Sequence, residues 1–95
     1  MSATVINMHD YIEALRLHVP PDIHPSTRSI IAEYLAEMHL AADDDPALVA
    51  KLAGFICYRV AQELRFEAEN CESARDFHEA YRLRRQADRF EASHA

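Results

Sequence analysis

The sequence predicts a small all-α domain, and three observations carry that prediction. The chain has 95 residues, a length that fits one domain. It contains one glycine and four prolines, too few turn residues for a sandwich of many short strands. Its apolar side chains recur at helical spacings of three and four residues. We therefore expect residues 1–95 to form a single domain of three to four helices.

The first two helices are expected over residues 8–18 and 27–41. Asn7 is a side chain of the helix-capping type, and Pro20 ends the first helix because proline cannot continue the hydrogen-bond ladder. Ser26 is expected to cap the second helix, after a connector rich in proline. The apolar stripes of these helices are Met8, Ile12, Leu15 and Val19, and then Ile31, Tyr34, Leu35, Met38 and Ala42.

A third helix is expected over residues 46–70. Asp45 is a favourable N-cap, and Pro46 occupies the first helical position, where its missing N–H leaves no bond unmade. Its apolar stripe consists of Val49, Leu52, Ile56, Val60 and Leu64, with Phe55 and Phe66 on a flank.

The last helix is expected over residues 73–92, because Ser73 and Asp76 have the spacing of a capping box. Asn70 is able to adopt the left-handed conformation that ends a helix. No glycine or proline lies at this break, so one continuous helix over 46–92 is the alternative. The second half is thus a long helical hairpin or a single long helix. Its last stripe consists of Phe77, Ala80, Leu83, Ala87 and Phe90.

Charge and cysteine content indicate the cellular environment in which the chain is expected to work. The net charge of −6 disfavours binding to nucleic acid or to anionic lipid. No apolar run reaches the roughly 18 residues that span a bilayer, and the first residues lack the pattern of a signal peptide. If one unbroken helix carries both Cys57 and Cys71, they are too far apart to pair, and free thiols suit a reducing compartment. These features predict a cytoplasmic protein.

A row of small residues on the third helix is the first candidate for function. Its members recur at spacings of four, three and four, and they are Ala50, Gly54, Cys57 and Ala61. Glycine inside a helix costs about 1 kcal/mol relative to alanine, so a close helix approach is expected to compensate. The neighbouring helix belongs either to the same chain or to a partner subunit.

Aromatic and arginine side chains are the second candidate, because these residue types dominate binding energy at protein interfaces. The candidate protein-binding residues are Phe55, Tyr58, Phe66, Tyr81, Arg84 and Arg85. Arg82 and Arg89 extend the arginine group, which makes the last helix a possible phosphate-binding surface. However, Glu79–Arg82 and Arg84–Asp88 stand at helical pairing distances, which favours a solvated face that pairs with itself.

Catalytic and metal-binding patterns are not found in the sequence. No two of the six histidines have the i, i+3 or i+4 spacing of helical metal ligands. Cys57 lies among apolar neighbours, where burial raises the pKa of a thiol and suppresses its reactivity. A single glycine cannot build a phosphate-binding loop. We therefore expect no metal, no cofactor and no catalytic residues, and an enzyme is a less favoured alternative.

These observations predict a small regulatory protein that binds another protein and occludes its surface, most simply as a homodimer. The partner we expect is a protein such as a transcription regulator. The alternative is a nucleic-acid-associated regulator that uses the arginine-rich last helix. In size and acidity the chain is similar to small bacterial inhibitors, such as quorum-sensing anti-activators, although no sequence motif supports this analogy.

Overall fold

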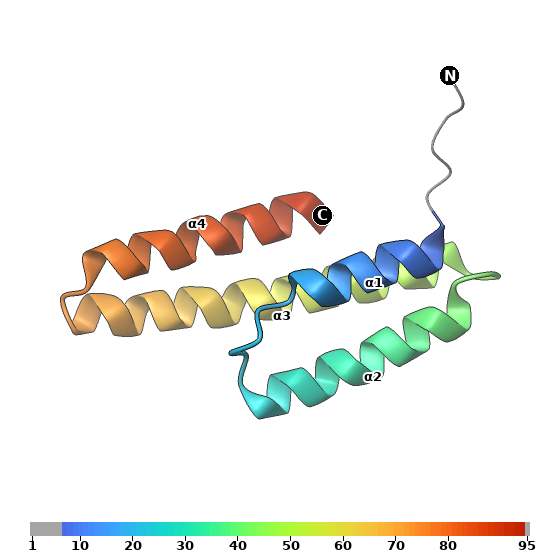
Figure 1. The fold of residues 1–95 in the computed structure, drawn as a ribbon, viewed down its shortest axis with the longest axis horizontal. Coiled ribbons are helices and arrows are strands. Elements are labelled where there is room, and N and C mark those ends of the chain that lie inside the picture. Colours follow the sequence, from blue (N-terminus) through green and yellow to red (C-terminus); the bar gives the residue numbers. More distant parts are fainter. Residues whose placement is uncertain (1–6, 95) are drawn as a thin grey trace, which may run out of the picture. The chain divides into compact units, whose positions relative to one another are not determined.

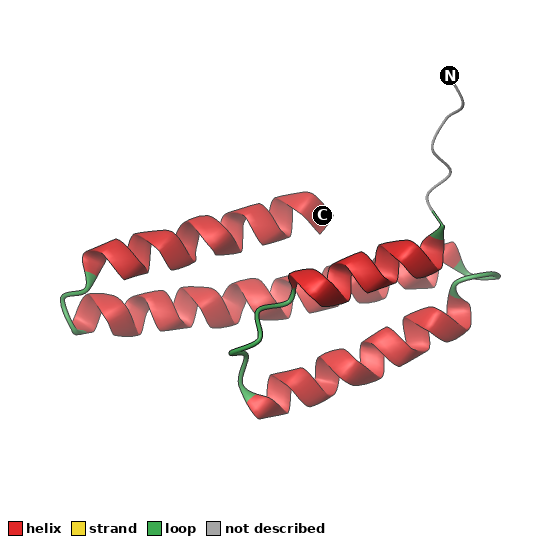
Figure 2. Ribbon diagram, in the orientation of Figure 1, coloured by secondary structure: helices red, strands yellow, loops and turns green. Residues whose placement is uncertain are grey.

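The computed structural model describes residues 7–94, and within this range the chain forms four α-helices and no strand (Figures 1 and 2). The helices are α1 (Met8–His18), α2 (Pro25–Ala41), α3 (Pro46–Ser73) and α4 (Phe77–His94). The predicted all-α class is therefore confirmed. None of these four helices combines the length and the apolar character that crossing a bilayer requires.

The chain divides into two compact units, and the boundary between them lies within the α3 sequence. The first unit ends at Ala53 and the second begins at Gly54. The N-terminal part of α3 therefore belongs with α1 and α2, and its C-terminal part belongs with α4. Each unit has its own set of buried apolar side chains.

Local capping accounts for both ends of α1. The Asn7 side chain accepts a hydrogen bond from the backbone N–H of His9 at 2.8 Å, as the sequence predicts for a cap at this position. At the other end, Val19 is extended and donates its N–H to the carbonyls of Leu15 and Arg16. The following Pro20 has no N–H to donate, so α1 stops at the predicted residue.

Helix α2 begins two residues earlier than predicted. His24, not Ser26, is the N-cap, and its imidazole accepts from the backbone N–H of Ser26 at 3.2 Å. Pro25 then takes the first helical position, where proline is favoured. Arg28 holds the connector against the helix by donating to the carbonyls of Pro21 and, at 3.2 Å, of Ile23.

The core of the first unit contains most of the predicted stripes of α1, α2 and the start of α3. Ile12 and Leu15 are fully buried, whereas Met8, Val19 and Tyr34 are half-buried. The remaining buried members of the predicted stripes are Ile31, Leu35, Met38, Ala42, Val49 and Leu52. At the start of α3, the Asp45 carboxylate accepts from the N–H of Leu48 at 3.1 Å, which confirms the predicted cap.

In the second unit, α4 lies beside the C-terminal part of α3 (Figure 1). Arg65 on α3 donates to Asp88 and to Glu91 on α4, each at 2.9 Å. These hydrogen bonds raise the pKa of the Arg65 guanidinium, and Arg65 in turn lowers the pKa of the Glu91 carboxyl. The apolar residues buried in this unit are Ile56, Cys57, Val60, Ala61, Leu64, Ala68, Ala80, Leu83, Ala87 and Phe90.

The boundary between α3 and α4 differs from both predicted versions. The helix passes through Asn70 and ends at Ser73, and α4 starts at Phe77, so the single helix over 46–92 is wrong. Arg75 adopts a positive φ of 63°. Its N–H bonds to the Glu72 carbonyl, and the N–H of Asp76 bonds to the Cys71 carbonyl. This pair of bonds is a Schellman motif, which ends a helix without glycine or proline.

Asp76, rather than Ser73, is therefore the residue that caps the last helix. Its carboxylate accepts from the N–H of Glu79 at 3.2 Å, and its carbonyl accepts from the N–H of Ala80. Ser73 donates its hydroxyl back to the Glu69 carbonyl within α3. The predicted capping box failed because the geometry of the preceding turn decides which of two capping residues starts the helix.

We predict that replacing Arg75 by glycine stabilises the protein. A left-handed backbone costs a non-glycine residue about 1–2 kcal/mol, part of which is offset by the greater unfolded-state freedom of glycine. We expect a net gain of up to about 1 kcal/mol, which raises the melting temperature by about 4–8 °C per kcal/mol in a chain of this size. Thermal unfolding followed by circular dichroism measures the shift.

Ala74→Gly is the matched control, because Ala74 precedes Arg75 in the same turn but does not have a positive φ. This variant gains nothing from the left-handed region and is expected to lose stability. A melting temperature that rises equally in both variants, or falls in Arg75→Gly, would contradict the role given to Arg75.

Candidate protein-binding surface

The predicted aromatic candidates are all exposed in the second unit. Phe66 and Tyr81 are each 63% exposed, and Phe55 and Tyr58 are about half exposed. The aliphatic residues between them, such as Ile56, are buried. The core of the unit is therefore built mainly from aliphatic side chains together with Phe90, whereas the candidate aromatic side chains are largely exposed.

Helix α3 carries three of these aromatics along one face. Phe55, Tyr58, Gln62 and Phe66 follow one another at offsets of three, four and four residues, so they form a continuous stripe. Gln62 joins the stripe by donating to the Tyr58 hydroxyl at 2.8 Å. Leu64 and Val60 project from the buried side of the same helix.

Helix α4 carries a second stripe, which consists of Phe77, Tyr81 and Arg85 at offsets of four residues. The Arg85 guanidinium carbon lies 5.8 Å from the centre of the Tyr81 ring, and its Nη1 is 3.3 Å from the Tyr81 hydroxyl. Arginine stacked on an aromatic ring is a common element of protein interfaces. We call the two stripes together the aromatic surface.

Phe77 belongs to the aromatic surface, although the sequence predicts it as a core residue. It is 62% exposed, so its predicted place in the buried stripe of the last helix is wrong. Phe77 is the first residue of α4 and directly follows the capping residue Asp76. The buried part of α4 begins one turn later, at Ala80. A correct prediction of the N-cap at Asp76 would have indicated that Phe77 lies before the buried part.

Arg84 is not a member of the two exposed stripes. It forms an ion pair with Glu72 of α3, which raises the pKa of its guanidinium. The predicted Arg84–Asp88 pair is wrong, since Asp88 instead accepts from Arg65. The predicted Glu79–Arg82 pair is confirmed, with Arg82 Nε at 2.9 Å from the Glu79 carboxylate.

The small-residue row does not form one buried strip. Ala50 is exposed, Gly54 is partly exposed, and Cys57 and Ala61 are buried. A Cβ atom placed on Gly54 meets no atom of the described chain within 4 Å. Close approach by another helix of the same chain therefore does not account for the glycine, and the version with a partner helix stays a prediction.

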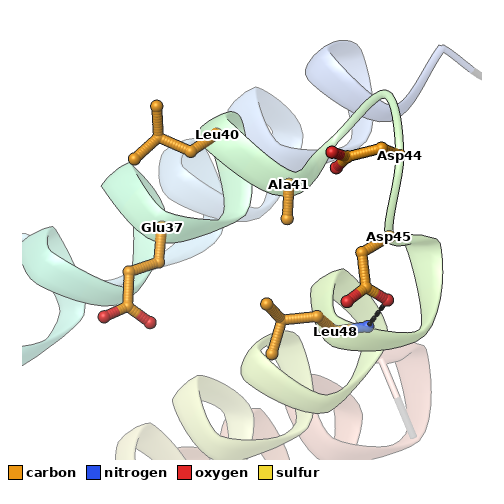
Figure 3. Close-up of a pocket in the computed structure, with 6 residues that line it drawn as sticks. All are labelled: Glu37, Leu40, Ala41, Asp44, Asp45 and Leu48. Atoms are coloured by element: carbon orange, nitrogen blue, oxygen red, sulfur yellow. Dashed lines mark hydrogen bonds between the residues drawn. The ribbon is translucent and has the colours of Figure 1, made fainter.

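The first unit contains an open groove that the sequence reasoning did not find. It has a volume of about 480 Å³ and lies at the junction of α2, the following turn and α3 (Figure 3). Leu40, which is 85% exposed, and Leu48 supply its largest apolar side chains. The full lining is Glu37, Leu40, Ala41, Asp44, Asp45 and Leu48. The carboxylates of Glu37, Asp44 and Asp45 thus lie around an apolar depression.

Two chemical features, a metal site and a reactive thiol, can be checked among the described residues. Among them, no group of three His, Cys, Asp or Glu side chains is arranged to hold a metal ion. Burial raises the pKa of the Cys57 thiol to about 12, and Glu91 adds a smaller effect in the same direction. A thiol that keeps its proton at neutral pH is a poor nucleophile.

Comparison with protein-family models, with curated proteins and with solved structures gave no match for this chain.

Proposed function

We propose that this chain is a small regulatory protein that binds another protein through the aromatic surface of α3 and α4. One observation carries the proposal: five large aromatic side chains are exposed on these helices, although the aliphatic core beneath them is already buried. Exposed apolar side chains that lie together on a surface mark interaction sites, and here they recur along one face of each helix. The five are Phe55, Tyr58, Phe66, Phe77 and Tyr81.

The proposed mechanism is occlusion. The aromatic stripe of one of the two helices inserts into a groove or packs on a helix surface of the partner. Tyrosine and phenylalanine bury large areas with few rotatable bonds, so they bind at a low cost in conformational entropy. Arg85, stacked on Tyr81, adds a charge that pairs with an acidic group of the partner.

Nucleic acid is the less favoured partner because three arginines of the unit are engaged by carboxylates of the same unit. Arg65, Arg82 and Arg84 each have a carboxylate partner. A phosphate backbone would have to displace those carboxylates, and the chain carries a net charge of −6.

A pair of exposed-residue variants tests the proposal. Phe66→Ser and Tyr81→Ser, made in the full chain, are expected to weaken capture of the partner from an extract of the native cell by at least about tenfold, as for interface hot spots. Leu17→Ser on α1 is the matched control, because Leu17 is 68% exposed but lies in the other unit. Bound proteins are identified and quantified by mass spectrometry at low and high salt.

Two results would overturn the proposal. The first is equal capture by the wild type and both serine variants. The second is loss of binding at high salt together with recovery of nucleic acid, which would favour the arginine-rich helix as a phosphate-binding surface.

A homodimer is part of the proposal, and Gly54 provides its test. If the chain is a monomer, Gly54→Ala fills open space and stabilises the helix by about 1 kcal/mol. If a second copy packs closely against Gly54, the added methyl group weakens the dimer instead. Light scattering is expected to give a mass near twice 10.9 kDa for the wild type and a smaller mass for Gly54→Ala. A wild-type mass of 10.9 kDa would remove the dimer from the proposal.

A further inference from the structure

Two histidines that are 30 residues apart in sequence meet between α1 and α2. The Nδ1 atoms of His9 and His39 are 3.0 Å apart, a hydrogen-bond distance. The ring centres are 5.3 Å apart and the ring planes differ by only 14°. The centre separation exceeds the Nδ1–Nδ1 distance by about two ring radii, so both nitrogens must lie on the line between the ring centres. The imidazoles therefore meet edge to edge, with one nitrogen aimed at the other.

This geometry requires one proton between the two nitrogens. Neutral imidazole has one N–H donor and one bare acceptor, whereas imidazolium has two donors and no acceptor. Nδ1 atoms without a proton repel through their lone pairs, and Nδ1 atoms that both carry protons repel through their N–H groups. The contact is favourable only when one Nδ1 donates and the other accepts.

Asp43 favours His9 as the acceptor. Its Oδ1 atom lies 3.6 Å from Nε2 of His9, the ring nitrogen that does not contact His39. A carboxylate favours a proton on the nitrogen that faces it, so neutral His9 carries its proton on Nε2 and accepts through Nδ1. His39 is then the donor through its own Nδ1.

The charges around the pair are mainly negative. Asp43 belongs to the turn after α2, and Glu13 on α1 interacts electrostatically with His39. Arg16 is the nearby cation, but it is hydrogen-bonded to Glu13 and holds the pKa of that carboxyl below its usual value. Asp10 follows His9 in the first turn of α1.

We propose that His9 and His39 form an acid-released latch between the start of α1 and the end of α2. A first added proton binds Nε2 of His39 and leaves the Nδ1–Nδ1 bond in place, now as a stronger charge-assisted bond. A second proton binds only at Nδ1 of His9, where it meets the N–H of His39 and breaks the contact. Because the closed pair excludes this second proton and the open pair accepts it, falling pH favours opening.

A metal chelate fits the pair less well. Two histidines that share one metal ion direct their lone pairs at a common point beside the line that joins the nitrogens, at an angle set by the coordination geometry. Here the two nitrogens point at each other, which matches a shared proton. A zinc titration tests this distinction directly.

Hydrogen exchange of the α1 backbone amides, followed by NMR in the full chain, tests the latch. After correction for the intrinsic pH dependence of exchange, α1 of the wild type is expected to keep its protection from pH 7.5 to about pH 6. At pH 4.8 the same amides are expected to exchange about fivefold to tenfold faster, which corresponds to the loss of one hydrogen bond of ordinary net strength.

Two variants separate the latch from a general effect of acid. His39→Gln removes the pair and is expected to show the faster exchange already at pH 7.5, with little further change at pH 4.8. His78→Gln removes an exposed histidine of α4 and is expected to behave as the wild type. Imidazole nitrogen shifts of His9 and His39 report the tautomers, which are expected to be Nε2–H for His9 and Nδ1–H for His39 at pH 7.5.

Three outcomes would overturn the latch. The first is the same pH dependence of α1 exchange in the wild type and in His39→Gln. The second is a pair of equal tautomers at pH 7.5. The third is protection of α1 by zinc in the wild type but not in His39→Gln, which would make the pair a metal chelate instead.

Discussion

Replacing Leu64 by alanine is expected to lower the free energy of unfolding by about 2–5 kcal/mol, the range for leucine removed from a protein core. Leu64 is 8% exposed, and it lies in the α3 segment of the second unit. Truncation removes buried methyl groups and leaves a cavity that the helix backbone cannot collapse to fill. A chain of this size has a total stability of only about 5–15 kcal/mol, so the melting temperature should fall steeply. Denaturant unfolding followed by circular dichroism measures the change.

Phe66→Ala, two residues further on, is the matched control. Phe66 is larger than leucine but mostly exposed, so its removal is expected to change the unfolding free energy by no more than about 0.5 kcal/mol. The contrast matters for function, because the aromatic surface can be altered in binding experiments only if it does not support the fold. A large loss of stability in Phe66→Ala, comparable with that of Leu64→Ala, would place Phe66 in the core and remove it from the proposed surface.

Cys57 is expected to resist alkylation strongly in the folded protein. Its thiol is buried, and burial raises its pKa from 9.0 to about 12. The thiolate is the reactive form, so at pH 8 its fraction falls about tenfold for each unit of the shift, or about a thousandfold in all. Reaction with iodoacetamide, followed at each cysteine by mass spectrometry, measures the rate.

Cys71 is the internal control for this experiment. It is only half-buried, and its pKa is raised first by burial and then by the neighbouring carboxylates of Asp76, Glu79 and Glu67. It should react more slowly than a free thiol but much faster than Cys57. In denaturant the two cysteines should react at similar rates. Equal rates in the folded protein would show that Cys57 is accessible and ionised.

The same shift makes a prediction about alkaline stability. The unfolded chain releases the Cys57 proton near the ordinary thiol pKa, whereas the folded chain holds it to about pH 12. The stabilising effect of the buried thiol is therefore complete below about pH 9 and declines as the pH rises toward the folded value. Cys57→Ala removes this dependence, so its stability should change less with pH over that interval.

The sequence by itself determined the helical class and half of the helix ends, because these depend on neighbours within a few residues. Asn7 caps α1, Pro20 follows its end, and Asp45 with Pro46 starts α3. The apolar periodicity also identified most of the core, including Ile12 and Ile56, since a helix buries one side whatever its partner. For the candidate aromatic residues, by contrast, a position on the flank of an apolar stripe did not determine whether the side chain is exposed.

The tertiary structure decided what depends on residues far apart in the chain. The Schellman turn at Arg75 moved the start of α4 to Phe77, and that shift left Phe77 in solvent. Arg84 pairs with Glu72 across two helices instead of with its helical neighbour Asp88. Helical periodicity describes contacts along one helix, whereas ion pairs between helices follow from how the helices pack.

The contact between His9 and His39 shows the same limit most clearly. Two histidines of one helix that share a metal ion or a proton can be recognised by their sequence spacing. His9 and His39 have no such spacing, because they lie on different helices. Only the packing of α1 against α2 brings their rings into line, next to a carboxylate supplied by the following turn. Local hydrogen bonding and periodicity therefore determined the helices, and the packing of one helix on another determined which polar groups meet.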